Sequence, residues 1–586
     1  MTGGDDRAEG TIVAPDQGAH DDDQLIATGK VEGQDALEQA LTALHDAETE
    51  LDTLRQSTGV RLGSLMVEAA KSAKQPFQFI KNLGPLALTI SEFVSCARID
   101  TGLFVGLPTQ ARSRASLTDR KDARRAAQLA RAIMTFGKRS SAVSEFSGIE
   151  AGTSAPWLKT RAHLALELAG LVRTGFPLPA RSVAQPCQQN GCVFYLVQSD
   201  PVSLNNGYTH RTHQLATRVA ALGWDIQPIV APAKRRAALD VPFGGLVYRR
   251  LMMQSRYEDG VAGYVADYAD QIVKLAEQRR PAVIHAASNF LNGLAGATAA
   301  RRLGIPCIYE VRGLWELTWL VDRPEFADAL GFHAQVRLET DAAAASDRVL
   351  PISSEIAGEL AKRGIAPRTM LIAPSGAPPQ YHATYEERRA MRQLFGIADD
   401  AFVTGYIGSI VSYEGLATLI RSFVEVKAAN ANARLLLVGQ GTDRQALMAL
   451  ANRLGLANDV IFPGRLNPSD ARRAYAALDV ACYPRDDTRV TQIVPPLKHM
   501  EAASAGLAII VSSVAPLKSF ADRTGAALVV PSGDAAALAR ALIDLMHHPE
   551  RREELGKAAR AAAARETWGE TARIVCETYR DVTSAH

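Results

Sequence analysis

Residues 485–513 read RDDTRVTQIVPPLKHMEAASAGLAIIVSS, and this stretch decides the fold. It predicts a polar loop, a short helix over residues 496–505, Gly506 as the stop of that helix, and a buried strand over residues 507–511. Another apolar strand, predicted over residues 480–483, precedes the loop. Two apolar strands joined through a helix are typical of a parallel βαβ unit.

The charged residues of this stretch predict a ligand site. Arg485, Arg489 and Lys498 follow the carboxyl end of a strand, which is where doubly wound sheets bind their ligands. Cations beside the amino end of a helix suit a phosphate. Glu501, in the second helical turn, suits a sugar hydroxyl better than an anion. The stretch therefore predicts a nucleotide-sugar site.

The same alternation of strands and helices occurs twice along the chain, which predicts two Rossmann-like α/β domains that face a cleft. The strands predicted for the first domain are 193–197, 226–230, 247–250, 283–285, 307–310 and 348–352. Those predicted for the second are 404–407, 433–438, 459–462, 480–483, 507–511 and 527–530. We expect the domains over residues 186–385 and 386–565, followed by a helix over 566–586, for which a return to the first domain is one interpretation.

The first 185 residues differ in composition from the rest. Residues 1–35 are acidic and poor in large apolar side chains, which predicts disorder. Leucines at helical spacing over 36–60 predict a short coiled coil, through which the chain either self-associates or packs on itself. For residues 61–185 we expect a helical extension with a basic run. Residues 60–140 are open to two interpretations, an interfacial segment that contacts a membrane surface or a small helical subdomain packed on the main body.

Bulk properties place limits on the partners. Of 586 residues, 47% are apolar and 22% charged, as in an ordinary globular protein. The net charge of +2 argues against nucleic acid as a partner. No secretory signal and no run of about 20 apolar residues is recognisable, so we expect a cytoplasmic protein, with a peripheral position at the inner face of the membrane left open.

In the first domain, the segment NNGYTHRTH places Gly207 just before a predicted helix, where backbone amides approach a phosphate closely. Arg211 is either a cation for a leaving diphosphate or an ordinary exposed arginine. His210 and His213 are open to a role in the cleft, at the surface or as helix caps.

Two neighbouring strands of the first domain end in further polar residues. His285 ends one strand, with Asn289 and Asn292 after it, and Glu310 and Arg312 end the next. Strand ends of this kind deliver polar groups to one wall of a cleft. For His285, a core position is an equal alternative, and Glu310 with Arg312 could equally form an internal ion pair.

Three strand ends of the second domain add glycines and polar residues. Ser409 follows the first strand, Gly439 the second and Arg465 the third. With Lys498 and Glu501, four strand ends face one crevice. The combination of these strand ends is a far more specific sign of a ligand site than any single residue among them.

From about Cys192 to Asp581 the chain resembles a retaining glycosyltransferase of the GT-B fold, family GT4, in the branch found with capsule and exopolysaccharide genes. The segments that carry the resemblance are NNGYTHRTH, IHAASNFLNGL, IYEVRGLWE, GYIGSIVSYEGL, LLLVGQG and TQIVPPLKHMEAASAG. The resemblance implies transfer of a sugar from a nucleotide-diphosphate sugar to a glycan or lipid-linked acceptor, in cell-surface polysaccharide or glycolipid synthesis. It implies front-face attack with retention, no carboxylate nucleophile, no metal and no cofactor besides the nucleotide-sugar co-substrate.

The resemblance also implies roles for individual residues. Glu501 would hold the ribose hydroxyls of the donor, Lys498 would face its diphosphate, and Gly207 would give the phosphates room. The remaining predicted donor-side residues are Ser409, Gly439, Arg465 and Arg489. The predicted catalytic residues are His285, Arg211 and Lys498, and the acceptor-side residues are Asn289, Asn292 and Arg312.

The chain departs from the family pattern at three places. The first Glu of the family's E-x7-E signature is replaced by Ile493, or by Gln492 in the spacing of this branch. The turn after the first strand of the second domain carries Ser409 and Glu414 where Arg and Lys are common, and His-Ala-His reads His285-Ala-Ala. These departures leave open two other functions, a catalytically inactive GT-B scaffold and a nucleotide-sugar epimerase.

Overall fold

A computed structural model describes residues 120–138, 141–153, 155–183, 191–204, 206–232, 240–253, 255–257 and 260–584. The predicted acidic tail, the predicted coiled coil over 36–60 and most of the predicted membrane-contact segment lie outside these residues.

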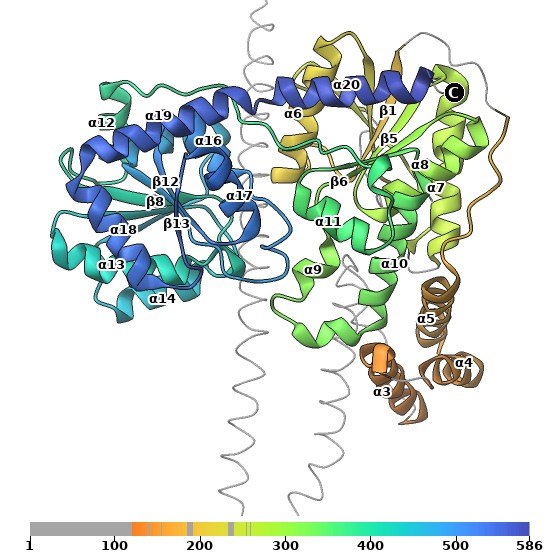
Figure 1. Ribbon diagram of the computed structural model, residues 1–586. Coiled ribbons are helices and arrows are strands. Elements are labelled where there is room, and N and C mark those ends of the chain that lie inside the picture. Colours follow the sequence, from red (N-terminus) through yellow and green to blue (C-terminus); the bar gives the residue numbers. More distant parts are fainter. Residues whose placement is uncertain are drawn as a thin grey trace, which may run out of the picture. The chain divides into compact units, whose positions relative to one another are not determined.

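The first domain is built on a seven-stranded sheet of order β3-β4-β2-β1-β5-β6-β7 (Figure 1). Its strands are β1 Cys192–Val197, β2 Asp225–Val230, β3 Asp240–Phe243, β4 Leu246–Arg250, β5 Val283–Ala287, β6 Cys307–Val311 and β7 Arg348–Pro351. All pair in parallel except β3, which runs antiparallel to β4 at the edge of the sheet. The sequence did not predict β3, because Asp and Pro are rare in strands and mark this one as an edge strand.

The helices of the first domain cover this sheet. They are α6 Gly207–Ala221, α7 Val261–Arg279, α8 Phe290–Leu303, α9 Trp315–Trp319, α10 Leu330–Ala345 and α11 Ser354–Lys362, with 3-10 turns at Pro324–Asp328 and Pro367–Thr369. Helix α8 packs closely enough to need glycine, since a Cβ at Gly293 would lie 2.7 Å from both Tyr309 and Ala342. The core therefore forms where α8 lies between the sheet and α10.

The second domain has a six-stranded parallel sheet of order β10-β9-β8-β11-β12-β13. Its strands are β8 Val403–Ile407, β9 Arg434–Val438, β10 Val460–Gly464, β11 Val480–Tyr483, β12 Ala508–Ser512 and β13 Leu528–Val530. Its helices are α12 Tyr385–Leu394, α13 Leu416–Ala429, α14 Arg444–Arg453, α15 Pro468–Arg473, α16 Lys498–Ser504, α17 Ala515–Thr524, α18 Ala535–His547 and α19 Pro549–Arg565, with 3-10 turns at Ser412–Glu414 and Ala474–Ala477. Together the two sheets confirm the predicted fold class of two parallel α/β domains.

The last helix, α20 (Trp568–Ser584), lies on the first domain although it follows the second in sequence (Figure 1). It packs against α6, and its buried residues Ala572, Val575 and Tyr579 belong to the same cluster as β1 side chains. The chain thus crosses from the second domain back to the first through residues 566–567.

Among the described residues, three helices precede the first strand, α3 Arg120–Met134, α4 Ala142–Gly152 and α5 Pro156–Thr174. Helix α5 packs against α10, and the Glu167 carboxylate accepts hydrogen bonds from the amides of Val261 and Ala262 at 2.9 and 2.8 Å, at the start of α7. For residues 120–174 the structure thus shows a helical subdomain packed on the first domain. Within the part of the chain that the structure describes, no helix is both long and apolar enough to cross a membrane.

Candidate active site

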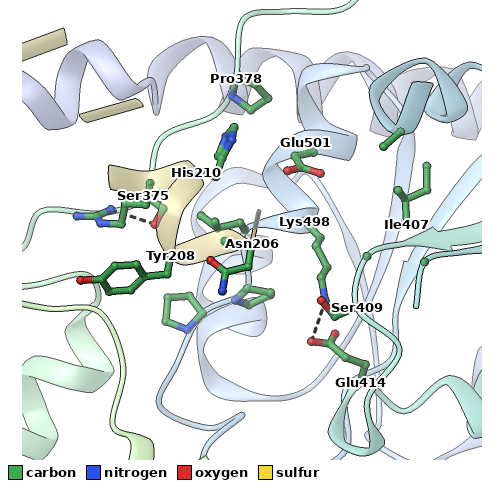
Figure 2. A pocket seen from close by; sticks show the side chains of 18 of the residues that line it. Asn206, Tyr208, His210, Ser375, Pro378, Ile407, Ser409, Glu414, Lys498 and Glu501 are labelled. Carbon is green, nitrogen blue, oxygen red and sulfur yellow. Dashed lines mark hydrogen bonds and ion pairs between the residues drawn. The ribbon is translucent and has the colours of Figure 1, made fainter. Parts of the chain in front are cut away.

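A cavity of about 820 Å³ lies between the two α/β domains. Its first-domain wall comes from the start of α6 and the loop after β6. Its second-domain wall comes from the loops after β8, β9 and β10 and from the start of α16. These are strand carboxyl ends, as expected for doubly wound sheets. Figure 2 shows Asn206, Tyr208 and His210 on one wall and Lys498, Glu501 and Glu414 on the other.

Helix α6 begins at the cavity. The Asn206 side chain caps it by accepting from the amide of Thr209 at 3.1 Å, and the Thr209 hydroxyl interacts in return with the Asn206 amide. Gly207 is the first helical residue, and a Cβ there would lie 3.3 Å from Leu497 of the facing domain. The helix therefore presents its amino end, where a partial positive charge favours anions, to a narrow gap.

Lys498 is the central cation of the second-domain wall. Its ammonium donates to Glu414 Oε1 at 3.1 Å (Figure 2). It also donates to the Tyr406 hydroxyl. Arg485 Nε lies 3.7 Å from the other oxygen of Glu414, and Arg485 Nη1 donates to the carbonyl of Val494 at 2.8 Å. One buried carboxylate thus faces two cations.

Burial and charge oppose each other in this cluster. Burial lowers the pKa of Lys498, although Glu414 acts against this effect. Burial by itself raises the pKa of Glu414, but Lys498 and then Arg485 outweigh it and hold that pKa below its usual value. Glu414 is therefore ionised near neutral pH and holds the ammonium in place.

Glycines allow the backbone to pass close to Lys498. Gly408 follows β8 with φ of 155°, and a Cβ there would lie 2.3 Å from Lys498 Cε. Gly439 follows β9 with φ of 143°, and its Cβ would lie 1.8 Å from the Gly408 carbonyl oxygen. No other residue type fits at either position.

Glu501 lies one helical turn after Lys498 and also lines the cavity. Its Oε2 accepts a hydrogen bond from the Tyr475 hydroxyl at 3.0 Å. Burial raises the pKa of Glu501, and the bond from Tyr475 partly counteracts the shift. The carboxyl is a hydrogen-bond acceptor with capacity left for ligand hydroxyls.

On the first-domain wall, Arg211 and Arg312 converge on one carboxylate, Glu310. Arg211 Nε donates to Glu310 Oε1 at 2.7 Å, and Arg312 Nη2 donates to Oε2 at 2.8 Å. All three side chains are buried. Burial on its own raises the pKa of Glu310, but Arg312 and Arg211 hold it far below its usual range. Of the alternatives, the structure shows the internal ion pair, with both arginines also lining the cavity.

His285 lies in the core rather than on the cavity wall. Its Nδ1 is 2.7 Å from the Tyr579 hydroxyl of α20, and its Nε2 is 3.7 Å from Glu310 Oε2. Burial lowers its pKa to about 4, so the ring is neutral near pH 7. The core alternative is the one that the structure shows.

The structure brings together eight of the predicted site residues at the cavity, which are Gly207, Arg211, Arg312, Ser409, Gly439, Arg465, Lys498 and Glu501. Four others lie elsewhere, namely His285, Asn289, Asn292 and Arg489.

Besides His285, the other three of these residues each interact with partners outside the cavity. Asn289 caps α8. Asn292 is buried, and its Oδ1 accepts from the Tyr268 hydroxyl at 3.2 Å. Arg489, half exposed, donates to Glu359 of α11 at 3.1 Å.

Sequence reasoning missed three side chains that shape the second-domain wall, Glu414, Tyr406 and Tyr475. A signal existed for Glu414, which directly follows a strand end in GYIGSIVSYEGL. The tyrosines resemble any core aromatic in sequence. His210 also points into the cavity (Figure 2), and burial lowers its pKa, so it is a neutral imidazole there.

The cavity's chemistry is that of binding and charge stabilisation. Among the described residues its lining includes two acids, Glu414 and Glu501, and each already has a partner, Lys498 or Tyr475. In the described ranges, no group of three His, Cys, Asp or Glu side chains is arranged to hold a metal ion.

Two family models match the chain. One, described as glycosyl transferases group 1, matches residues 387–562, and the other, described as a glycosyl transferase 4-like domain, matches residues 206–376. The matches fall on the two α/β domains and include most of the residues that line the cavity, whereas Pro378, Pro379 and Tyr381 lie between the two matched ranges.

Among curated proteins, the chain is similar to a D-inositol 3-phosphate glycosyltransferase of Stackebrandtia nassauensis, with 28% identity over 51% of this chain and 68% of the relative. It is also 33% identical to a GDP-mannose-dependent monoacylated alpha-(1-6)-phosphatidylinositol monomannoside mannosyltransferase of Corynebacterium glutamicum, over 30% of this chain and 47% of the relative.

Among solved structures, sucrose-phosphate synthase of Thermosynechococcus elongatus aligns with a TM-score of 0.56 and 18% identity, over 67% of this chain and 100% of that one. Anabaena HepE in complex with UDP and glucose aligns with a TM-score of 0.51 and 17% identity, over 66% and 98%. At such identities these structures bear on the fold alone.

Proposed function

The chain belongs to the group 1 glycosyltransferases of family GT4 and has their GT-B fold, and from that premise we propose that it transfers a sugar from a nucleotide-diphosphate sugar to a glycan or lipid-linked acceptor. The reaction we propose retains the anomeric configuration and needs neither a metal nor a cofactor. We place it in the synthesis of a cell-surface polysaccharide or glycolipid of the capsule type, in the cytoplasm.

One observation carries the proposal. A single cavity joins the amino end of α6 with the Lys498 ammonium and the Glu501 carboxyl. A diphosphate suits the helix end and the ammonium, and ribose hydroxyls suit the carboxyl. One similar protein supports a donor of this class, since the Corynebacterium mannosyltransferase is named as GDP-mannose-dependent.

The proposed role of the side chains is to position the donor and to stabilise the charge of its leaving diphosphate. Lys498 and the α6 amides face that charge. Glu501 fixes the ribose, and Ser409, Gly439 and Arg465 complete the donor side. Arg211 and Arg312 act through the Glu310 ion pair, which orders the opposite wall.

The state of the two cavity acids fits front-face attack better than a covalent double displacement. A retaining hydrolase uses two free carboxyl groups about 5–5.5 Å apart across the scissile bond. Here Glu414 is bound to Lys498, and Glu501 is held by Tyr475. Front-face attack, assisted by the leaving diphosphate, needs no third carboxyl group.

The test begins with donor binding by the full chain. A panel that includes UDP-glucose and GDP-mannose is screened by thermal unfolding, because a donor at about 100 times its Kd stabilises the folded state by about 2.7 kcal/mol. The donor that binds is then supplied with glycan and lipid-linked acceptors, with and without a chelator. The anomeric configuration of the product is read by NMR, and we expect retention at an undiminished rate with chelator.

Other outcomes identify the alternatives. Failure to bind any donor would favour the inactive scaffold. An altered sugar, still linked to its nucleotide in the absence of acceptor, would favour the epimerase.

A further inference from the structure

The second-domain wall contains a buried carboxylate where a diphosphate site is expected to hold only cations. Glu414 is 3% exposed and lines the cavity. Its two oxygens lie 3.1 Å from Lys498 Nζ and 3.7 Å from Arg485 Nε. A negative charge in this place opposes the binding of any anion to those two cations.

The fold fixes Glu414 in this position. It ends a 3-10 turn, Ser412–Glu414, between β8 and α13, and the following Gly415 has φ of 69°. A Cβ at Gly415 would lie 2.0 Å from the Pro484 carbonyl oxygen, so the turn packs directly against the end of β11. The backbone that carries Glu414 therefore cannot move away from the wall without a rearrangement of this turn.

Its bonding is incomplete. Glu414 Oε2 and Arg485 Nε are both buried, and neither has a hydrogen-bond partner among the described residues. An ion pair optimised for stability would place Glu414 Oε2 and Arg485 Nε within hydrogen-bond distance, because a buried charge without a hydrogen bond is costly. One oxygen of Glu414 and one donor of Arg485 therefore have hydrogen-bonding capacity that the protein does not use.

We propose that Glu414 makes the cavity discriminate against the nucleoside diphosphate and in favour of the nucleotide sugar, so that the product leaves after transfer. This inference rests on the proposed function. Glu414 would then determine specificity without taking part in the chemical step.

The physical reason is the difference in charge between the two ligands. A nucleotide sugar carries two negative charges on its diphosphate. A free nucleoside diphosphate approaches three above about pH 6, where a terminal phosphate loses its second proton. Lys498 and Arg485 alone would bind the product more tightly than the donor. A fixed carboxylate between them reduces that preference, because its repulsion grows with the charge of the ligand.

The test substitutes Glu414→Gln, which keeps the shape of the side chain and removes its charge. Calorimetry at pH 7.5 measures Kd for UDP with UDP-glucose and for GDP with GDP-mannose, in the full chain. In the pair that wild type binds, we expect the nucleoside diphosphate to gain about tenfold more affinity than the nucleotide sugar. The inhibition constant of the nucleoside diphosphate should fall by the same factor as its own Kd. Glu425→Gln, an exposed residue of α13, is the matched control and should leave the ratio unchanged.

A ratio of the nucleotide-sugar Kd to the nucleoside-diphosphate Kd that stays within twofold of the wild-type ratio would overturn the inference. So would a loss of donor affinity with UDP or GDP affinity unchanged, which would make Glu414 a contact for a sugar hydroxyl. Should Glu414→Gln fail to fold, Lys498→Gln is compared with the double variant Lys498→Gln/Glu414→Gln. In that background the loss of the Glu414 charge leaves only Arg485 without its carboxylate. There the added Glu414→Gln change should again favour the nucleoside diphosphate, and no change would overturn the inference. If wild type binds a different donor of the panel, the comparison uses that donor and its nucleoside diphosphate, and if it binds none, the proposed function itself fails.

Discussion

Lys498 is the residue whose charge the donor site depends on most. It is partly buried, it lines the cavity, and its ammonium is held by Glu414 and Tyr406. We expect Lys498→Gln to lower kcat/KM for sugar transfer by about 10²–10³-fold, the usual effect of removing one group that stabilises transition-state charge. Initial rates with the identified donor measure this.

Folding should survive the loss of Lys498, because Glu414 keeps Arg485 nearby. Lys518→Gln is the control, since Lys518 forms an exposed i,i+4 pair with Asp522 on α17 and should leave kcat/KM unchanged. Full activity of Lys498→Gln would show that the diphosphate is held elsewhere.

Glu339, on α10, should make the stability of the protein depend on pH. Burial, and then the nearby Glu316, raise its pKa to about 8. Between its unfolded pKa near 4.5 and about 8, the folded state binds a proton that the unfolded state has released. Stability is therefore lost as the pH rises through this window, by up to about 1.4 kcal/mol per pH unit.

The substitution Glu339→Gln, which is neutral at every pH, should remove this loss. Urea unfolding at pH 5, 6.5 and 8 would show a smaller decline in the free energy of unfolding than in wild type, and Glu425→Gln should decline as wild type does. Equal declines in Glu339→Gln and wild type would mean that Glu339 titrates normally.

At the scale of elements, helix α20 stabilises the first domain through a polar contact in its core. The Tyr579 hydroxyl lies 2.7 Å from His285 Nδ1, and both side chains are buried. We expect Tyr579→Phe to lower the free energy of unfolding by about 1–3 kcal/mol, because a buried ring nitrogen loses its partner. Donor affinity should not change, since neither residue lines the cavity.

Denaturant unfolding and calorimetry of Tyr579→Phe separate these two effects. Tyr385→Phe, on the exposed face of α12, is a control with the same chemical change and should alter neither quantity. A large fall in kcat together with unchanged stability would instead restore His285 to the predicted catalytic role.

Strand ends were predictable from the sequence, whereas the direction of each side chain was not. Val480–Tyr483 and the helix before Gly506 follow from apolar runs and a stop signal, and both lie where predicted to within two residues. A position at a strand end does not say which way the side chain turns. His285 therefore lies in the core, and Arg489 pairs with Glu359.

Pairings between distant residues were equally beyond the sequence. Glu414 and Lys498 are 84 positions apart, and Glu310 meets Arg211 across 99. Only the folded sheets bring such groups into contact. The charge of each wall is thus a property of the whole molecule.

Packing between the N-terminal helices and the first domain also determines where the N-terminal extension can be truncated without loss of stability. Helices α3–α5 bury Phe146, Leu158, Leu164 and Leu168, and α5 packs against α10. Removing residues 1–180 would expose the surface that they cover, at about 1.5–3 kcal/mol for each large side chain left without cover. We expect that protein to unfold at a clearly lower temperature than the full chain, and the protein lacking only residues 1–119 to unfold within a few degrees of it.

The shorter truncation then tests the predicted membrane contact. If the segment before α3 brings the enzyme to a lipid-linked acceptor, removal of residues 1–119 should reduce sedimentation with anionic vesicles several-fold, because a basic interfacial segment binds through both apolar burial and charge. Donor affinity should stay as in the full chain, since the cavity-lining residues in the part of the chain that the structure describes all lie at or after Asn206. Neutral vesicles serve as the control for charge. Equal sedimentation of both proteins with anionic vesicles would assign any membrane contact to residues that the two share.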